Sequence, residues 1–286
     1  MRSIDYTAVV QAVEQLCTAA CHRLPEDVRA ALEQALAKES DPTARDALEK
    51  LIQNADLARD QMIPLCQDTG LAVVFVEQGA AVTIRPPQDG LDLTIVDAIN
   101  AGVQSGYEKG FLRSSVVADP LRRLNTGTNT PAIVHTTVVP GDQLKLTVLA
   151  KGGGCENRSQ FRMFNPAVGQ QQICDWVVSV VKAAGADACP PLIVGVGIGG
   201  DFETSCLLAK RSLLRDLRVP HPDPFYADME KDLLSAINAS GLGPQGLGGH
   251  TTALAVLIET SACHIASLPV AVNIECHSHR HQTVVL

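Results

Sequence analysis

The chain has 286 residues, enough for one large domain or two modest ones with hydrophobic cores. Its formal net charge of −8 argues against a nucleic-acid partner, because binding to phosphates needs an excess of lysine and arginine. No stretch approaches the roughly 20 apolar residues of a membrane span, and residues 1–20 lack the apolar run of a secretion signal, so we expect a cytoplasmic protein.

The first 60 residues are expected to form helices. Apolar side chains recur there at helical spacing, beginning with Val9, Val10, Val13, Leu16 and Cys17. Pro25 suits the first turn of a second helix, and Ser40-Asp41-Pro42 suits the start of a third. Cys17 and Cys21 lie one helical turn apart, and with no other ligand type beside them we interpret both as core residues rather than a metal pair.

Strands and helices mix in the rest of the chain. Runs of aliphatic and β-branched residues predict strands at 71–78, 82–85, 132–139, 143–154, 192–200, 252–259 and 269–275. Helices are predicted at about 92–109, about 166–184, from 203, and after the proline-rich segment 218–224. The strands on either side of Pro140-Gly141-Asp142 predict a hairpin. This order predicts an α+β fold in a single domain, residues 1–286, with 1–60 mainly helical and 61–286 mixed.

The stretch "IPLCQDTG", residues 63–70, places a thiol, an amide, a carboxylate and a hydroxyl on successive residues. A packed core would not contain these four polar groups in succession, because a buried polar group costs free energy unless it finds a partner. A loop that holds a metal and a polar substrate would use them. Cys189, before Pro190-Pro191, and Cys276, at a strand end, are similarly placed, although such long separations do not match a zinc finger or a ferredoxin.

Two other segments admit competing interpretations. "CHSHRH", residues 276–281, contains a cysteine and three histidines, which suits either a zinc site or an ordinary strand-end surface. "VGVGIGGDFE" has glycines at 195, 197, 199 and 200 between a strand and a helix, but not in the frame of a dinucleotide-binding loop. Close packing of the helix on the strand is the alternative. "KGGGCENRS" lacks the end of a phosphate loop, and Cys155 follows its glycines.

Several motifs together resemble one family. They are "PLCQDTG", "LRSSV", "NTGTNTPA", "KGGGCENRS", "ACPP", "VGIGGDFETS", "GLGPQGLGG" and "HIASLPVAVNIEC", in unbroken order over roughly residues 60–280. In this order they closely resemble the α subunit of the two-subunit, iron–sulfur-dependent class I fumarate hydratases and L-tartrate dehydratases. The resemblance implies the cluster-binding domain of the class I fumarase type and a [4Fe–4S] cluster held by Cys66, Cys189 and Cys276. One iron would then lack a protein ligand and could act as a Lewis acid on a substrate hydroxyl.

The same resemblance implies a substrate pocket. Gln67, Asp68, Arg113 and Gly154 stand at the family's substrate-binding positions, and His264 stands at the position of its active-site histidine. An arginine offers a planar fork to a carboxylate, and glycine lets a ligand approach the backbone. Histidine can hydrogen-bond the substrate or move a proton near neutral pH. We expect Asp68 and His264 to act in catalysis and leave the identity of the general base open.

The chain stops before the second domain that single-chain relatives carry, so the resemblance implies a separate β subunit and an α2β2 assembly. The expected reaction is reversible dehydration of a small 2-hydroxy dicarboxylate: malate to fumarate first, with L-tartrate as the alternative. Two other hypotheses for the function of the chain remain. One is a non-catalytic metal-binding scaffold, and the other is a nicotinamide-dependent oxidoreductase that uses the glycines at 195–200.

Overall fold

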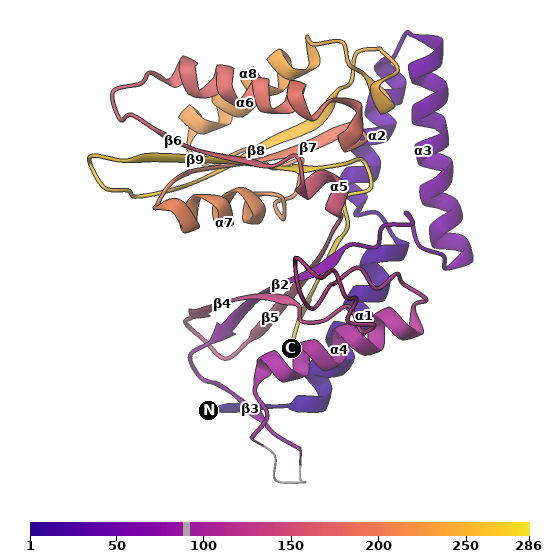
Figure 1. Ribbon diagram of the computed structural model, residues 1–286, viewed down its shortest axis with the longest axis vertical. Helices are drawn as coiled ribbons and strands as arrows, with labels where there is room; N and C mark the ends of the chain where they lie inside the picture. The colour runs from indigo at the N-terminus through magenta and orange to yellow at the C-terminus, as the bar shows by residue number, and fades with distance from the viewer. Residues whose placement is uncertain (88–91) are drawn as a thin grey trace. The chain divides into compact units, whose positions relative to one another are not determined.

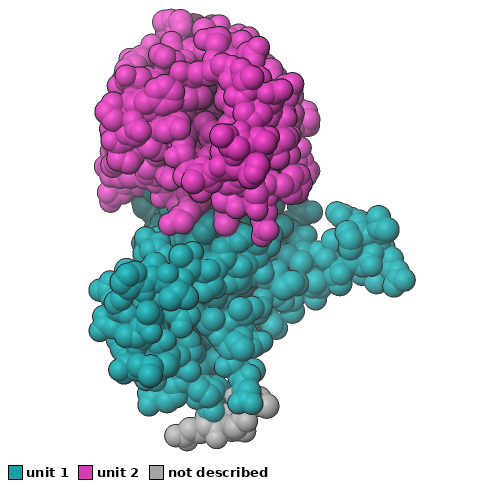
Figure 2. All heavy atoms as spheres, turned by 90° about the vertical axis from the view of Figure 1, so that its left-hand side faces the viewer, with its two compact units in different colours: residues 1–25, 55–153, 280–286 teal, residues 26–54, 154–279 magenta. Residues whose placement is uncertain are grey.

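The computed structural model describes residues 1–87 and 92–286, and this chain divides into two compact units (Figure 2). Unit 1 comprises Met1–Pro25, Ala55–Gly153 and Arg280–Leu286, and unit 2 comprises Glu26–Asn54 and Gly154–His279. Each unit has a hydrophobic core of its own. Whether both fold together as the single domain expected for 1–286 stays a prediction.

Unit 1 combines β-sheet with two whole helices and the end of the helix Pro42–Gln61 (Figure 1). Its elements are β1 (Arg2–Asp5), α1 (Tyr6–His22), β2 (Leu71–Gly79), β3 (Val82–Arg85), α4 (Ile95–Lys109), β4 (Ile133–Val139), β5 (Leu144–Lys151) and β10 (His281–Val285). The main sheet has the order β10-β5-β2-β4, in which β2 is parallel to β4 and antiparallel to β5. Strands β1 and β3 form a small parallel pair.

Helices α1 and α4 pack closely together and cover one face of this sheet. Alternate residues of β2, namely Ala72, Val74 and Val76, contribute to the same core, as expected when successive side chains point to opposite faces. Gly106 permits the close approach, since a Cβ there would lie 2.8 Å from the Glu14 carbonyl oxygen of α1.

Unit 2 contains the second sheet. Its elements are α2 (Glu26–Lys38), the first part of α3 (Pro42–Gln61), most of α5 (Gly153–Glu156), β6 (Gln160–Phe164), α6 (Gln170–Ala184), β7 (Leu192–Gly199), α7 (Phe202–Ser212), α8 (Pro224–Asn238), β8 (Ala253–Ser261) and β9 (Leu268–Glu275), with short 3-10 turns at Gly185–Ala188 and Pro244–Gly246. The order is β6-β9-β7-β8. Strand β7 is parallel to β8 and antiparallel to β9, which is antiparallel to β6.

Helices cover both faces of the unit 2 sheet, with α6 and α8 on one face and α7 on the other (Figure 1). A Cβ on Gly195 or Gly197 of β7 would lie 2.1 Å from a carbonyl oxygen of α7, that of Ala209 or Ser205. These glycines therefore serve close helix–strand packing, which confirms that interpretation of "VGVGIGGDFE".

The predicted helices and strands are all present, within a few residues at their ends. The predicted hairpin is wrong, because β4 and β5 do not pair with each other; both pair with β2, which lies between them. The short strands β1, β6 and β10 were missed. The fold is mixed in both units, compatible with the expected α+β class. In the described part of the chain, no helix has the length and apolar character needed to cross a bilayer.

Candidate functional site

The loops that carry Cys189 and Cys276 lie at the same end of the unit 2 sheet. Cys189 precedes β7 and Cys276 follows β9, and these strands are antiparallel, with Ile193 opposite Glu275. The start of one strand therefore adjoins the end of the other. Cys189 is exposed, and its φ of 54° is left-handed, whereas Cys276 is buried.

A hydrogen-bond network links the two loops. Nδ1 of His277 lies 3.0 Å from the Cys189 carbonyl oxygen. The Gln245 side chain donates from Nε2 to the Pro190 carbonyl oxygen at 2.7 Å and lies 3.1 Å from the same His277 nitrogen. Sequence reasoning gave Gln245 no role, although it stands within the quoted motif "GLGPQGLGG". Its importance depends on contacts that only the fold creates.

A third cysteine lies at this end of the sheet. Sγ of Cys155, a carboxylate oxygen of Glu275 and Sγ of Cys276 all lie within 4.8 Å of one another. All three residues are buried, with 5%, 1% and 9% of their surface exposed. Cys155 comes here because β6, which follows it, begins beside the end of β9, with Gln160 opposite Val272.

The histidines of "CHSHRH" do not gather into a zinc site. Among the described residues, the group with metal-binding spacing is Cys155, Glu275 and Cys276, and it includes no histidine. His279 is fully buried, and its Nε2 donates to the Leu213 carbonyl oxygen at 2.7 Å. His277 and His279 of that segment therefore serve loop contacts and packing.

In unit 1, Asp68 is fixed by backbone groups. Its carboxylate accepts from Gly70 N at 2.9 Å and from Gly153 N at 2.8 Å, so it joins "CQDTG" to "KGGG". The buried Arg280 donates from Nη1 to the Asp68 carbonyl oxygen at 2.7 Å. Cys66, the third expected ligand, is half-buried in this loop, with its Sγ 3.3 Å from Oε1 of the exposed Gln67.

Thr69 holds Arg113 against the same loop. Its hydroxyl accepts from Arg113 N at 2.9 Å and donates to Arg113 O at 3.1 Å. The backbone of Arg113 is thereby anchored while the residue stays exposed, with its guanidinium available to an anion. The hydroxyl noted in "IPLCQDTG" therefore holds the backbone of Arg113, a role that the sequence did not predict.

Asn129 connects two further motifs to this loop. Its Oδ1 accepts from Ser115 N at 2.7 Å and from Val116 N at 3.2 Å, and its Nδ2 donates to Gly70 O at 3.2 Å. The residue is fully buried. "LRSSV", "NTGTNTPA" and "CQDTG" thus meet at one amide side chain.

His264 lies at the opposite end of the unit 2 sheet from Cys276. It stands in the exposed connection between β8 and β9, and β9 runs for 8 residues before Cys276. A strand of that length spans about 27 Å. The structure therefore does not bring His264 to the cysteine end of the sheet in its own chain. Gly154, by contrast, lies at that end beside Cys155, with no heavy atom within 4 Å of a Cβ placed on it.

Cys17 and Cys21 are confirmed as core residues, since both are buried among α1, α4 and the sheet. Burial raises the pKa of the Cys21 thiol to about 11, and burial also raises the pKa of Cys17. Both thiols are consequently protonated near neutral pH and are poor nucleophiles.

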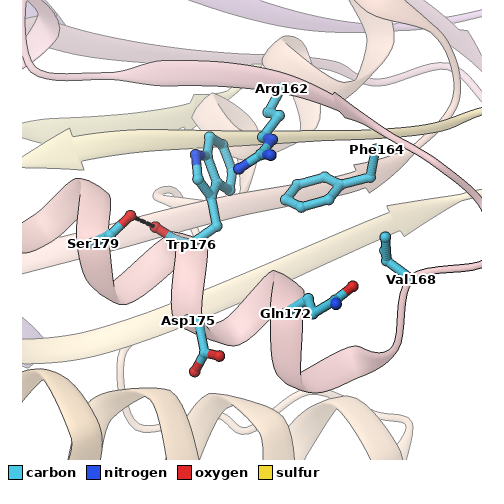
Figure 3. A pocket seen from close by; sticks show the side chains of 7 residues that line it. All are labelled: Arg162, Phe164, Val168, Gln172, Asp175, Trp176 and Ser179. Carbon is cyan, nitrogen blue, oxygen red and sulfur yellow. Dashed lines mark hydrogen bonds between the residues drawn. The ribbon is translucent and has the colours of Figure 1, made fainter.

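The groove between β6 and α6 carries no convergent catalytic groups (Figure 3). It has a volume of about 440 Å³ and is lined by Arg162, Phe164, Val168, Gln172, Asp175, Trp176 and Ser179. Phe164 meets Trp176 edge to face at 5.5 Å, and the Arg162 guanidinium lies 4.7 Å from the Phe164 ring centre. None of the expected site residues lines this groove.

Comparison with known proteins gives consistent matches along the chain. The sequence matches the family described as fumarate hydratase (Fumerase) over residues 10–285. A Methanocaldococcus jannaschii protein provisionally named L(+)-tartrate dehydratase subunit alpha is 38% identical over 273 residues, 94% of this chain and 94% of that protein. The L(+)-tartrate dehydratase subunit alpha of Escherichia coli O157:H7 is 31% identical over 268 residues, 92% of this chain and 86% of that protein.

Proposed function

The chain belongs to the fumarate hydratase (Fumerase) family, and we propose that it is the α subunit of an iron–sulfur hydro-lyase that reversibly dehydrates a 2-hydroxy dicarboxylate. The observation that carries this proposal is the family match, which extends from residue 10 to residue 285. The relatives described above, whose names specify an α subunit, support a role beside a second polypeptide.

We assign Cys66, Cys189 and Cys276 as ligands of a [4Fe–4S] cluster. Thiolates are the donors that such clusters use. The fit is supported by two of these residues, since Cys189 and Cys276 flank antiparallel strands at one end of a sheet and their loops are hydrogen-bonded. When bound, a four-iron cluster with three protein ligands supplies a Lewis-acidic iron for the hydroxyl that leaves.

The other expected residues would bind and orient the substrate. The anchored, exposed Arg113 offers its guanidinium to a carboxylate. Asp68, held by Gly70 and Gly153, keeps a fixed orientation and has further lone pairs to accept from the substrate hydroxyl or from water. Gln67 presents an amide from the exposed part of the same loop, and at Gly154 the absence of a side chain leaves the backbone open to a ligand.

His264 would have to act from a second chain. The length of β9 separates it from Cys276, so within one chain it cannot reach a substrate bound at the cysteine end of unit 2. Its exposure leaves it available to another copy of the subunit in the proposed α2β2 assembly.

We also propose a cytoplasmic location, because nine cysteines without a disulfide framework suit a reducing compartment.

Two substrates fit this chemistry. Malate and fumarate are the substrates expected first, in agreement with the family description. L(+)-tartrate is the alternative, and the names of the similar proteins support it. The α chain should be co-expressed with its β partner and assayed anaerobically with malate, fumarate and both tartrate enantiomers. Water elimination from malate or from L-tartrate supports the proposal. A colourless, zinc-containing complex inactive on all four would favour the scaffold hypothesis instead.

Single substitutions test the ligand set. Cys66→Ser, Cys189→Ser and Cys276→Ser should each lose bound iron and activity, because each removes one of three attachment points. Cys174→Ser, which changes a half-buried cysteine of α6, is the matched control and should retain both. Iron and acid-labile sulfide per chain are measured together with turnover. If one of the first three variants retained its full content of iron and sulfide, the cysteine replaced in it would not be a cluster ligand.

A further inference from the structure

Cys155 and Glu275 have the placement of metal ligands but are not needed by the proposed cluster. Together with Cys276 they form a buried trio with ligand atoms within 4.8 Å of one another. All three belong to unit 2, so the arrangement is internal to one compact unit. We name Cys155, Glu275 and Cys276 the trio.

The spacing of the trio suits one ion better than a cluster. In a four-iron cluster each cysteine binds a different iron, which keeps the ligand sulfurs well apart. A single tetrahedral Zn²⁺ binds sulfur at about 2.3 Å and carboxylate oxygen at about 2.0–2.2 Å, so its ligand atoms lie about 3.5–4 Å from one another. A small inward shift of the side chains would bring the trio to that spacing.

The trio is held in place by surrounding contacts. Cys155 lies within α5, and its neighbour Glu156 bonds to Lys210 and accepts from Asn273 Nδ2 at 3.0 Å. Cys155 Sγ lies 3.5 Å from the Ala188 carbonyl oxygen. Behind Glu275, Nδ1 of the buried His279 lies 3.9 Å from Oε2 and packs against the carboxylate.

We propose that Cys155, Glu275 and Cys276 form a mononuclear site for a thiophilic divalent cation such as zinc, in chains that have not received a cluster. Two thiolates and a carboxylate match the ligands of zinc, and a fourth position is left for water. The site competes with cluster assembly because it shares Cys276. Only this competition rests on the proposed function; the metal site itself does not.

Cobalt provides the direct test. The reduced, metal-free α chain is titrated anaerobically with Co²⁺, whose thiolate charge-transfer absorption reports sulfur ligands. The wild type should bind one equivalent, and Cys155→Ser and Glu275→Gln should each weaken binding by about 100-fold or more, since even the loss of an outer group costs about 10–100-fold. Cys174→Ser is the control with unchanged binding, and circular dichroism verifies that each variant is folded. Unchanged Co²⁺ affinity in both folded variants would overturn the proposal.

Two comparisons separate this site from the cluster. Cys66→Ser and Cys189→Ser should bind Co²⁺ like the wild type; if they weaken it as much as Cys155→Ser does, the ion uses the cluster cysteines and the proposal fails. Cys155→Ser should still accept iron and sulfide, and one equivalent of Zn²⁺ should block that uptake in the wild type only. Loss of iron uptake in Cys155→Ser would make Cys155 a cluster ligand and overturn the mononuclear site.

The two proposals can also fail separately. If Co²⁺ binding depends on Cys155 but the chain never takes up a cluster, the metal site is supported and the proposed function is wrong.

Discussion

Asn129 joins three backbone groups through one buried amide. Replacing it by alanine leaves the Ser115 and Val116 N–H groups and the Gly70 carbonyl without this partner. It also places alanine at a φ of 55°, which asparagine tolerates better. Asn129→Ala should lower the free energy of unfolding by about 2–4 kcal/mol, measured by urea denaturation.

Asn129→Asp provides a second comparison, since it keeps the acceptor oxygen for Ser115 and Val116 but turns a carboxylate oxygen toward the Gly70 carbonyl oxygen at a fully buried site. At pH 7 it should lose at least as much stability as Asn129→Ala, because a buried charge without a donor is costly. Gln53→Ala, at an exposed position of α3, should change the free energy of unfolding by less than about 0.5 kcal/mol. If Asn129→Ala were as stable as that control, the amide would not hold the motifs together.

The sequence predicted the positions of some site residues and not of others. The motifs predicted that Cys189 and Cys276 lie close together, and the fold brings their loops to one end of the sheet, although their role as ligands stays a prediction. Gln245 was missed, and Thr69 was noted only as a hydroxyl of its loop, because the roles of both depend on partners far along the chain, Pro190 and Arg113. Nor could the sequence predict the position of His264, because spacing along a chain does not reveal which end of a sheet a loop occupies.

At the scale of elements, Glu39 ties the end of α2 to the glycine-rich loop before β8. Its buried carboxylate accepts from Ser40 N at 2.9 Å, Asp41 N at 3.0 Å and His250 N at 2.7 Å. Burial alone would raise the pKa of Glu39, but the hydrogen bonds from Asp41, His250 and Ser40 lower it overall from its ordinary 4.5. The ionised carboxylate is therefore the form that the fold stabilises.

Glu39→Gln should reduce the free energy of unfolding by about 1–3 kcal/mol at pH 7. The folded-state pKa lies below that of the unfolded chain, so the contribution is complete above about pH 4.5 and is lost as the pH falls through the folded value. The difference between wild type and variant should shrink accordingly in urea titrations from pH 7 to pH 3. Glu33→Gln, on the exposed side of α2, should show a small difference at every pH. If the difference in free energy of unfolding between wild type and Glu39→Gln stayed the same at low pH, this account of Glu39 would be wrong.

Close contact between α7 and β7 depends on Gly195. A methyl group there would lie 2.1 Å from the Ala209 carbonyl oxygen, and the helix would have to move away. We expect Gly195→Ala to lower the free energy of unfolding by about 3 kcal/mol, as overpacking of a core does. Gly169→Ala is the matched control, because its φ of −78° is ordinary and nothing lies within 4 Å of the added atom. Equal melting temperatures for the two variants would show that α7 can move away from β7 without loss of stability.

The element pattern was predictable where packing follows local periodicity. The helices α1, α4, α6, α7 and α8 and the longer strands match their sequence patterns. The error at β4 and β5 has a physical cause: a proline-glycine turn between two strand patterns predicts that they are consecutive, but not that they are adjacent in the sheet. Strand β2 takes the place between them. The strands β1, β6 and β10, of 4–5 residues, were missed because so short a pattern is not decisive, although the 4-residue β3 was predicted.

At the scale of the whole molecule, neither compact unit is a continuous piece of chain. Unit 1 takes its last strand from Arg280–Leu286, after the chain has completed unit 2. Strand β10 pairs with β5 from His281 to Val285, Val284 and Leu286 pack against the unit 1 core, and Arg280 bonds to Asp68. The C-terminal seven residues thus stabilise the sheet next to the Cys66 loop.

Deleting residues 280–286 tests whether the two units unfold separately. The truncated chain loses one edge of the unit 1 sheet, so amides of β2 and β5 should exchange with deuterium faster, by a factor of about 100 or more, corresponding to about 3 kcal/mol. Amides of β7 and β8 in unit 2 make none of these contacts and serve as the internal control. Unchanged protection in β7 and β8 would mean that each core is stable by itself. Faster exchange in both sheets would mean that residues 1–286 unfold as the one cooperative domain expected from the sequence.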